Sequence, residues 1–360
     1  MKIKPGTFPK GVRVIAVLFV AACLARVYSC VRGPDVPRFP GLPTPARPIA
    51  VAVMPPADLA NRLALEQRSD HGHRSRCTRL GLLALGLVET IEPPPLFPSR
   101  SILDRIFGYE VTPAFYVTGT DTIFVSTKDH PSLAHEWIHA LDDQHGTRLR
   151  DAIDPAVSLD RRIALRAAIE GTAIHLVGSQ PQTLLLGNDF DVNSWTFAYS
   201  IGPRYVSVLA RGDAARALRL RPESVYEVLF LAAPPVRNTD WADWPGTLLC
   251  EDELGVLALL TAMNQSGAAS RDDAMRVARA WAGDRLSVRL LDGERLIFWE
   301  IALADSLAAS IWRRTGKLHL SLVGSAHVTE RVLGGAPELF DHPLSALRKL
   351  SSAVDSVRAK

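Results

Sequence analysis

The sequence is poor in cysteine, shows no internal repeat and carries little net charge. Only four of its 360 residues are cysteines, and no two of them form a CxxC pair. A zinc site built from thiolates and thioredoxin-like redox chemistry are therefore not expected. The formal net charge is +3. A chain without a basic patch lacks the electrostatic footprint of a nucleic-acid-binding protein, so we exclude nucleic acid as a partner.

The apolar run from Val14 to Ala25 is too short to cross a membrane. As a helix its twelve residues rise only about 18 Å, whereas the hydrocarbon core is about 30 Å thick. Four basic residues precede the run: Lys2, Lys4, Lys10 and Arg13. A basic start followed by a short apolar segment is the order found in a signal peptide. Removing those four charges takes the formal net charge from +3 to −1.

Val20-Ala21-Ala22-Cys23 resembles a bacterial lipobox, in which the cysteine becomes the acylated first residue. Cys30 ends a weaker second candidate. We expect residues 1–30 to act as a signal peptide or as a lipoprotein anchor with Cys23 as the lipidation site, and an uncleaved anchor stays open as an alternative. Each reading places an exported protein in the bacterial cell envelope, either membrane-anchored or periplasmic. There, Cys77 and Cys250 could form a disulfide or remain two buried thiols.

The rest of the chain divides into a linker and one folded domain. Eight prolines lie between residues 34 and 56, so residues 31–56 are predicted to be a proline-rich linker. Residues 57–350 then form the domain, and a hydrophobic content of 47% can supply a substantial core. Most of this domain has helical patterns. We predict an α+β fold that is mostly α, with one small sheet.

Two segments predict β-hairpins. Residues 115–117 and 123–126 are rich in β-branched and aromatic residues, and the turn formers Gly119, Thr120 and Asp121 separate them. Residues 288–299 show the same pattern around Asp292 and Gly293. The first hairpin comes directly before the helix discussed next, so the small sheet is expected beside that helix.

The stretch His135-Glu136-Trp137-Ile138-His139 fits the HExxH pattern of zinc hydrolases. Residues four apart lie one above the other on a helix, so His135 and His139 can share one Zn²⁺ ion. Glu136 is then placed to act as the general base for a metal-bound water. Leu133, Trp137 and Leu141 fall on the opposite side of the helix, which predicts one face for the metal and one for the core.

A catalytic zinc needs a third protein ligand, and two residues compete for that role. Glu170 lies on a second predicted helix, residues 157–176, among small residues that would let the two helices approach closely. His145 has the spacing of the metzincin signature, but Asp142 stands where that signature needs glycine. We therefore favour Glu170. An exposed ion pair between Glu170 and Arg166 is the structural alternative.

Asp142 follows His139 by nearly one turn on the same helical face. Its carboxylate could accept the imidazole N–H of His139 and so fix the tautomer of a metal ligand. A simple carboxylate near the end of a helix explains the residue equally well.

The run from His135 to His145 resembles a bacterial group of zinc metallopeptidase-like proteins whose helix reads HELTHALQDQH. Glu170-Gly171-Thr172-Ala173 is similar to the EGDA motif of that group, with Thr172 at the usual Asp position. Residues 222–229 and 281–285 look like its PxSTEQVL and W-x-G-D-R segments. The resemblance implies a gluzincin-type, zincin-like domain. Its metal ligands would be His135, His139 and Glu170, with Glu136 as the base.

From these patterns we expect an exported zinc metallopeptidase that hydrolyses peptide bonds in peptide or protein substrates. The alternative is an envelope lipoprotein that keeps the zincin scaffold for binding or assembly, with weak or no catalysis. Thr172 and Phe230, which stands where relatives often carry His, favour that alternative. Tyr205 and Tyr226 are candidate hydrogen-bond donors to a transition state in place of the missing His.

Overall fold

The computed structural model describes residues 39–67, 73–89, 114–127, 130–179, 187–235, 240–315, 325–332 and 338–339. The predicted signal peptide with Cys23 and Cys30 lies outside these ranges. Within them the chain is α+β with helix predominating, which confirms the predicted fold class. No helix in the described ranges is long and apolar enough to span a membrane.

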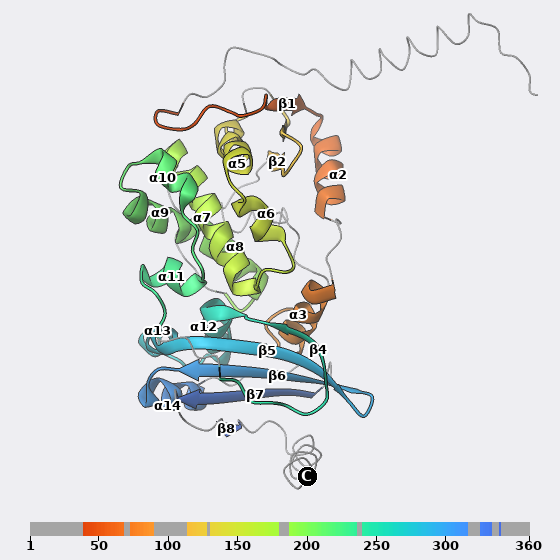
Figure 1. Cartoon of the computed structure of the whole chain (residues 1–360), viewed down its shortest axis with the longest axis vertical. Coiled ribbons are helices and arrows are strands. Elements are labelled where there is room, and N and C mark those ends of the chain that lie inside the picture. The colour runs from red at the N-terminus through yellow and green to blue at the C-terminus, as the bar shows by residue number, and fades with distance from the viewer. Residues whose placement is uncertain are drawn as a thin grey trace, which may run out of the picture.

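The helices form a layer between two small sheets that lie at opposite ends of the molecule (Figure 1). The helices are α2 Pro56–Gln67, α3 His73–Ala84, α5 Leu133–His145, α6 Arg148–Ile153, α7 Leu159–Val177, α8 Phe190–Ser200, α9 Gly202–Ala210, α10 Ala214–Arg219, α11 Val225–Phe230, α12 Gly255–Ser266, α13 Arg271–Ala280 and α14 Ser306–Thr315. The strands are β1 Ala50–Val53, β2 Phe115–Val117, β3 Thr122–Val125, β4 Thr247–Asp252, β5 Trp281–Leu291, β6 Glu294–Leu303, β7 Ser325–Val332 and β8 Glu338–Leu339.

The three-stranded sheet has the order β1-β3-β2 and includes the predicted hairpin, which is confirmed as β2 and β3. Strand β1 pairs parallel with β3, although it falls in the segment predicted to be a linker. Residues 49–53 read IAVAV and follow the main cluster of prolines. Because these residues are apolar and include β-branched side chains, they suit a buried strand more than a solvated spacer.

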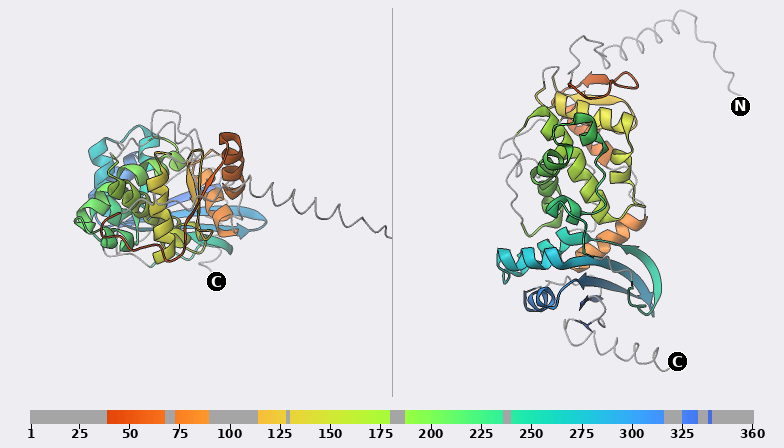
Figure 2. Two further views of the ribbon diagram at one scale, coloured as in Figure 1. Left: turned by 90° about the horizontal axis from the view of Figure 1, so that it is seen from above. Right: turned by 60° about the vertical axis from the view of Figure 1, so that its left-hand side comes forward.

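The five-stranded sheet has the order β4-β5-β6-β7-β8 and lies beneath the helical layer in the right-hand view of Figure 2. Its β5–β6 hairpin confirms the second predicted hairpin. Asp292 and Gly293 have φ values of 52° and 82°. A two-residue turn that joins strands with a right-handed twist requires positive φ at both of its central residues. Strands β4, β7 and β8 were not predicted, because residues after Leu176 were assigned mostly to helices and only one sheet was expected.

Helix α12 lies at the centre of the main hydrophobic core. All nine residues from Gly255 to Met263 are buried, and the helix contacts α7, α8, α11, α13 and β5. A helix that is apolar on all sides has no face for water, so it is surrounded by other elements. It joins the five-stranded sheet to α7, the helix that carries Glu170.

Candidate metal centre

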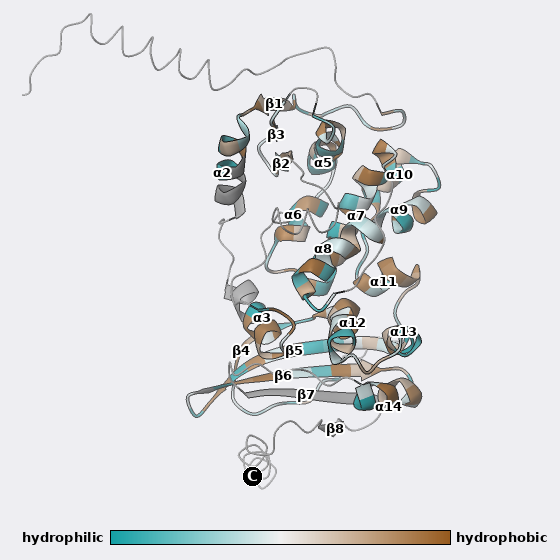
Figure 3. Ribbon diagram, turned by 180° about the vertical axis from the view of Figure 1, so that it is seen from behind, coloured by the Kyte–Doolittle hydropathy of each residue, from teal (hydrophilic) through white to brown (hydrophobic). Residues whose placement is uncertain are grey.

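Helix α5 presents one face to the three-stranded sheet and the other to α7. Trp137, Ala140 and Leu141 pack against residues of β2 and β3 in one buried apolar cluster. Figure 3 shows that hydrophobic and hydrophilic residues both occur along α5. The predicted apolar face of this helix is thereby confirmed, and the polar residues His135 and His139 lie on the remaining surface, toward α7.

Helix α7 runs from Leu159 to Val177, close to the predicted 157–176, and brings Glu170 to the two histidines. Nε2 of His135 lies 3.0 Å from Oε2 of Glu170 and 3.0 Å from Nε2 of His139. Nε2 of His139 is 3.6 Å from the same Glu170 oxygen. Three potential ligand atoms from two helices therefore converge on one point. The predicted alternative for Glu170, an ion pair with Arg166, is not formed.

These distances fit a metal-binding tripod. With bonds of about 2.0–2.2 Å, the ligands of a tetrahedral zinc ion are separated by about 3.4 Å. The three atoms also combine two neutral imidazole nitrogens with one carboxylate oxygen, a donor set that zinc commonly accepts. The residues present thus suit Zn²⁺ in both spacing and chemistry.

The electrostatics of the cluster also favour positive charge. Burial alone would lower the pKa of His139, but the Glu170 and Glu136 carboxylates outweigh it and raise that pKa to about 9. Although burial opposes it, the two histidines lower the pKa of Glu170 well below its usual range. The two carboxylates thus stabilise a positive charge at this point, which favours the binding of a divalent cation.

Glu136 lies beside the tripod, and its candidate ligand atom is within 4.8 Å of those of both histidines. Its Oε2 accepts a 2.9 Å hydrogen bond from the backbone N–H of Tyr116 in β2. The side chain is buried, and burial raises its pKa above the ordinary value for Glu. A carboxylate held in place with its pKa shifted toward neutrality has the properties of a general base.

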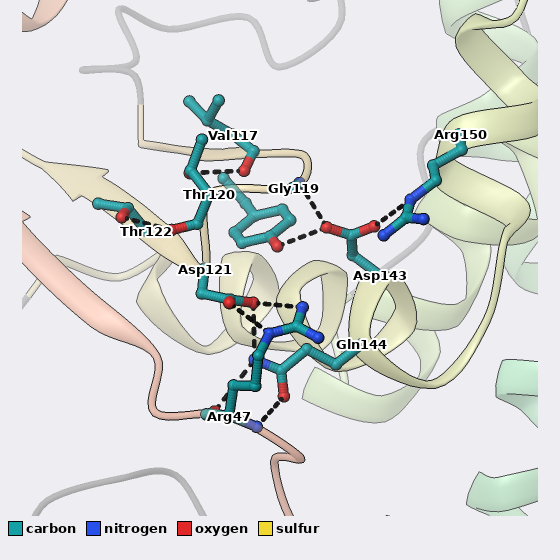
Figure 4. A network of polar contacts seen from close by, with 10 residues as sticks. Arg47, Val117, Gly119, Thr120, Asp121, Thr122, Asp143, Gln144 and Arg150 are labelled. Carbon is teal, nitrogen blue, oxygen red and sulfur yellow. Dashed lines mark hydrogen bonds and ion pairs between the residues drawn. The ribbon is translucent and has the colours of Figure 1, made fainter.

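Asp143 holds the β2–β3 hairpin against α5, and so keeps the backbone N–H of Tyr116 next to Glu136. Its buried Oδ2 accepts hydrogen bonds of 2.7 Å from the Tyr116 hydroxyl and 2.6 Å from Gly119 N. Arg150 lies 3.5 Å from the other oxygen. Figure 4 shows this network beside a second one, in which Asp121 binds Arg47 and Gln144. The tip of the hairpin is therefore attached to α5 through polar contacts.

Asp142 does not contact His139 as predicted. Its carboxylate binds the guanidinium of Arg148 at 2.7–3.1 Å, and both side chains are 1% exposed. Among the described residues, none accepts a hydrogen bond from Nδ1 of His139. The prediction was wrong because Arg148, six residues further on, folds back beneath α5. A full positive charge is a stronger partner for the carboxylate than a neutral imidazole N–H.

Thr172, at the usual Asp position of the resemblance, also lies at Arg148. Its hydroxyl is 2.6 Å from the Ala168 carbonyl oxygen and 3.2 Å from that of Ala217. The Arg148 guanidinium binds the carbonyls of Ala217 and Leu220 at 3.0 Å. Position 172 therefore belongs to a buried contact among α6, α7 and α10, and not to the surroundings of the two histidines.

The small residues of α7 serve a different contact from the one predicted. A Cβ on Gly171 would lie 2.3 Å from the backbone of Gly202 in α9, and one on Gly202 would lie 2.1 Å from the Ala167 carbonyl oxygen. Both glycines are therefore needed for the close approach of α7 and α9. Ala173 lies in one apolar cluster with Ile138 of α5.

The remaining candidates lie elsewhere. His145 binds the Thr44 carbonyl oxygen at 2.8 Å at the end of α5, and the tripod contains Glu170 instead. The hydroxyl of Tyr205 binds Glu227, and that of Tyr226 binds the Arg279 carbonyl. Phe230 packs against Tyr226 and beneath the Arg279 guanidinium. None of these three aromatic side chains has a recorded contact with His135, His139 or Glu170.

The tyrosine that lies at the candidate metal centre is Tyr199, on α8, and it was not predicted from the sequence. Its hydroxyl lies close to Glu170, and burial together with the nearby carboxylates raises its pKa well above 10. Its ring stacks on Trp195, one turn earlier, at a centroid distance of 6.3 Å. The i, i+4 aromatic pair was a visible signal, but such pairs usually mark core packing.

The segment 281–285 has a structural role. Both oxygens of Asp284 are occupied by uncharged donors, with distances of 2.8 Å to Gly255 N and 2.7 Å to Nε1 of Trp299. Nε1 of Trp281 and the backbone N of Leu254 also donate to this carboxylate. Asp284 thus attaches β5 and β6 to the start of α12.

Comparison with protein-family models, with curated proteins and with solved structures gave no match. Any functional assignment therefore rests on the geometry of the chain itself.

Proposed function

We propose that the protein is a zinc-dependent metallopeptidase of gluzincin type, with His135, His139 and Glu170 as metal ligands and Glu136 as general base. One observation carries the proposal. Two imidazole nitrogens and one carboxylate oxygen from separate helices lie 3.0–3.6 Å apart, with a buried glutamate beside them. The first two ligands and the base are also the residues of an HExxH pattern.

A zinc ion held by this tripod would supply Lewis-acid polarisation of a carbonyl and lower the pKa of water to about 7. The chain supplies the proton transfers. Oε2 of Glu136 accepts the Tyr116 N–H, so Oε1 is the oxygen that takes a proton from the attacking water. Glu136 then passes that proton to the leaving amine. Its raised pKa makes Glu136 a stronger base for the first of these two transfers.

Tyr199 has a positioning role in this proposal. The buried hydroxyl of Tyr199 lies close to Glu170, and in this proposal it donates a hydrogen bond to that carboxylate and so orients it toward the two histidines. Because a phenol with so high a pKa stays protonated, it remains a donor throughout the reaction. This hydrogen bond supports a ligand, as carboxylates and amides do in other metal sites.

We also propose that the protein acts outside the cytoplasm, on peptide or protein substrates in the cell envelope. The sequence of residues 1–30 supports export. A second support is that Cys250 is disulfide-bonded, since disulfides persist in oxidising compartments. Pairing with Cys77 remains a prediction, because the side chain of Cys77 is outside the described part of the structure.

The test is hydrolysis by Glu136→Gln, which keeps the size of the side chain but removes the base. We expect cleavage of a general peptide library to fall by about 10²–10⁴-fold while the zinc content stays at the wild-type level. Glu223→Gln is the matched control, because Glu223 is exposed and its carboxylate pairs with Arg161, away from the tripod. Unchanged hydrolysis by Glu136→Gln would contradict the proposal.

The non-catalytic alternative gives a different result in the same experiment. A wild-type protein that binds zinc but cleaves no peptide would support a binding or assembly role. Thr172 and Phe230, the two differences from the resembling family that favoured this alternative, both have contacts away from the tripod. Thr172 contacts Arg148 and backbone carbonyls, and Phe230 contacts Tyr226 and Arg279, so neither residue weakens the tripod directly.

A further inference from the structure

Arg166 lies on α7 one turn before Glu170 and has no carboxylate within ion-pair distance among the described residues. The two carboxylates that attract it most are already engaged. Glu170 binds His135 and lies close to Tyr199. Both oxygens of Asp191 accept 2.7 Å hydrogen bonds from Arg79. Arg166 is partly exposed, and a partly buried guanidinium without a counter-ion among the described residues is unusual, because burying an unpaired charge is costly.

The guanidinium is held in place by an aromatic face. Its central carbon lies 4.2 Å from the ring centroid of Trp195, which is within cation–π distance. Burial, and the neighbouring charge of Arg162, lower the pKa of Arg166 to about 10. The indole Nε1 of Trp195 is also buried and has no acceptor among the residues that the structure describes.

These groups adjoin the metal centre through a continuous series of contacts. Arg166 covers Trp195, Trp195 stacks with Tyr199, and Tyr199 lies close to Glu170. Along α7, Arg166 and Glu170 are separated by about 6 Å. That length corresponds to about two residues of an extended peptide.

We propose that Arg166 binds a carboxylate of the peptide substrate, within about two residues of the bond that is cleaved. This inference rests on the proposed function. A carboxylate matches the fork of N–H donors on a guanidinium, and would supply the negative charge that the described residues do not. The carboxylate could belong to the C-terminus of the peptide or to an acidic side chain. The substrate class is therefore an anionic peptide, recognised at a site next to the tripod.

The test measures binding and does not require turnover. Full-length Glu136→Gln protein, loaded with zinc, is titrated with matched short peptides while tryptophan fluorescence is recorded, since Trp195 lies directly beneath Arg166. One pair of peptides differs in a free or amidated C-terminus, and a second pair differs in Glu or Gln beside the central bond. We expect the carboxylate form of one pair to bind at least about thirtyfold more tightly than its neutral form. The pair that shows this difference identifies which carboxylate is recognised.

Arg166→Met in the same background should abolish that difference while leaving the affinity for the neutral peptide unchanged. Arg166→Lys keeps the charge but not the fork, and should retain only part of the preference. Arg204→Met is the matched control, because Arg204 is an exposed arginine on α9. Equal binding of carboxylate and neutral peptides by the parent protein would overturn the proposal without any need for the variants.

The outcome is separable from that of the proposed function. If the protein binds zinc and hydrolyses peptides but shows no carboxylate preference, the peptidase assignment stands and the role of Arg166 is wrong. If carboxylate peptides bind through Arg166 and no hydrolysis occurs in the wild type, the anion site stands and the peptidase assignment fails.

Discussion

The two ends of the molecule bury different kinds of side chain. Around α5 and α7 the interior holds ionisable groups in close contact: Glu136, His139, Asp142, Asp143, Arg148 and Glu170. Around the five-stranded sheet it holds mainly aromatic and aliphatic groups, including Trp281, Phe298, Trp299 and Trp312, each at most 1% exposed. Stability in the first region depends on pairing buried charges, and stability in the second depends on close packing of apolar side chains.

This difference indicates where stability and function reside. A buried ion pair stabilises a fold only weakly against an apolar substitute, but the loss of one partner is severe. An apolar core contributes through the area that it removes from water. We therefore expect the sheet region to contribute most of the stability of the fold. Part of that stability offsets the cost of burying charged groups at the metal centre between α5 and α7.

Arg148→Met should have the largest effect on stability in the polar region. It leaves Asp142 buried without a cation, so we expect the free energy of unfolding to fall by about 3–5 kcal/mol. Urea denaturation followed by circular dichroism measures the change. Arg221→Met is the control, because the partly exposed pair of Arg221 with Asp151 should contribute at most about 1 kcal/mol. Similar losses in both variants would show that burial does not distinguish the two pairs.

Met263→Ala tests the apolar region. Met263 is fully buried in α12, so its truncation should lower the free energy of unfolding by about 2–5 kcal/mol and leave the zinc content unchanged. Leu307→Ala is the control, since Leu307 is 54% exposed and should change stability by less than about 0.5 kcal/mol. If Met263→Ala also removed zinc, the two regions would not be separable in the way described.

Asp284 is one of a few charged residues buried at the five-stranded sheet, with Asp252, Arg289 and Glu300, and its pH dependence sharpens the comparison. Burial raises its pKa from 3.8 to about 6, although four N–H donors oppose the shift. The folded state then binds this proton more tightly than the unfolded state, so the contribution to stability is lost as pH rises from about 4 through 6. Asp284→Asn removes the titration.

The free energy of unfolding of wild type, relative to Asp284→Asn, should therefore fall by at most roughly 3 kcal/mol between pH of about 4 and 7. Denaturation curves at several pH values measure this difference. Because both proteins share every other titrating group, the difference isolates Asp284. A constant difference, or one that grows with pH, would contradict the raised pKa.

Local patterns were enough to predict much of the fold and of the centre. Helices α5 and α7 and both hairpins follow from periodicity and turn residues within single segments. His135, Glu136 and His139 belong to one motif, and Glu170 followed from the need for a third ligand on a nearby helix. In each case the evidence lies within a short stretch of sequence or within two neighbouring helices.

Contacts between distant segments could not be predicted. Strand β1 is 69 or more residues from its partner β3, and β4 pairs with β5 across a pair of helices. Tyr199 reaches Glu170 only because α8 folds back along α7. Asp142 was assigned to His139 because its real partner, Arg148, reaches it only after a turn at the end of α5. Periodicity within a segment carries no information about these partners.

Zinc binding by Glu170→Ala tests the central claim most directly, because it removes the one ligand that does not belong to the HExxH pattern. We expect the wild type to bind one zinc ion per chain and Glu170→Ala to bind it at least about a hundredfold more weakly, as measured by competition with a chelator. His145→Ala should bind zinc like the wild type, since His145 binds the Thr44 carbonyl oxygen at the end of α5. Wild-type affinity in Glu170→Ala, or loss of zinc in His145→Ala, would contradict the account.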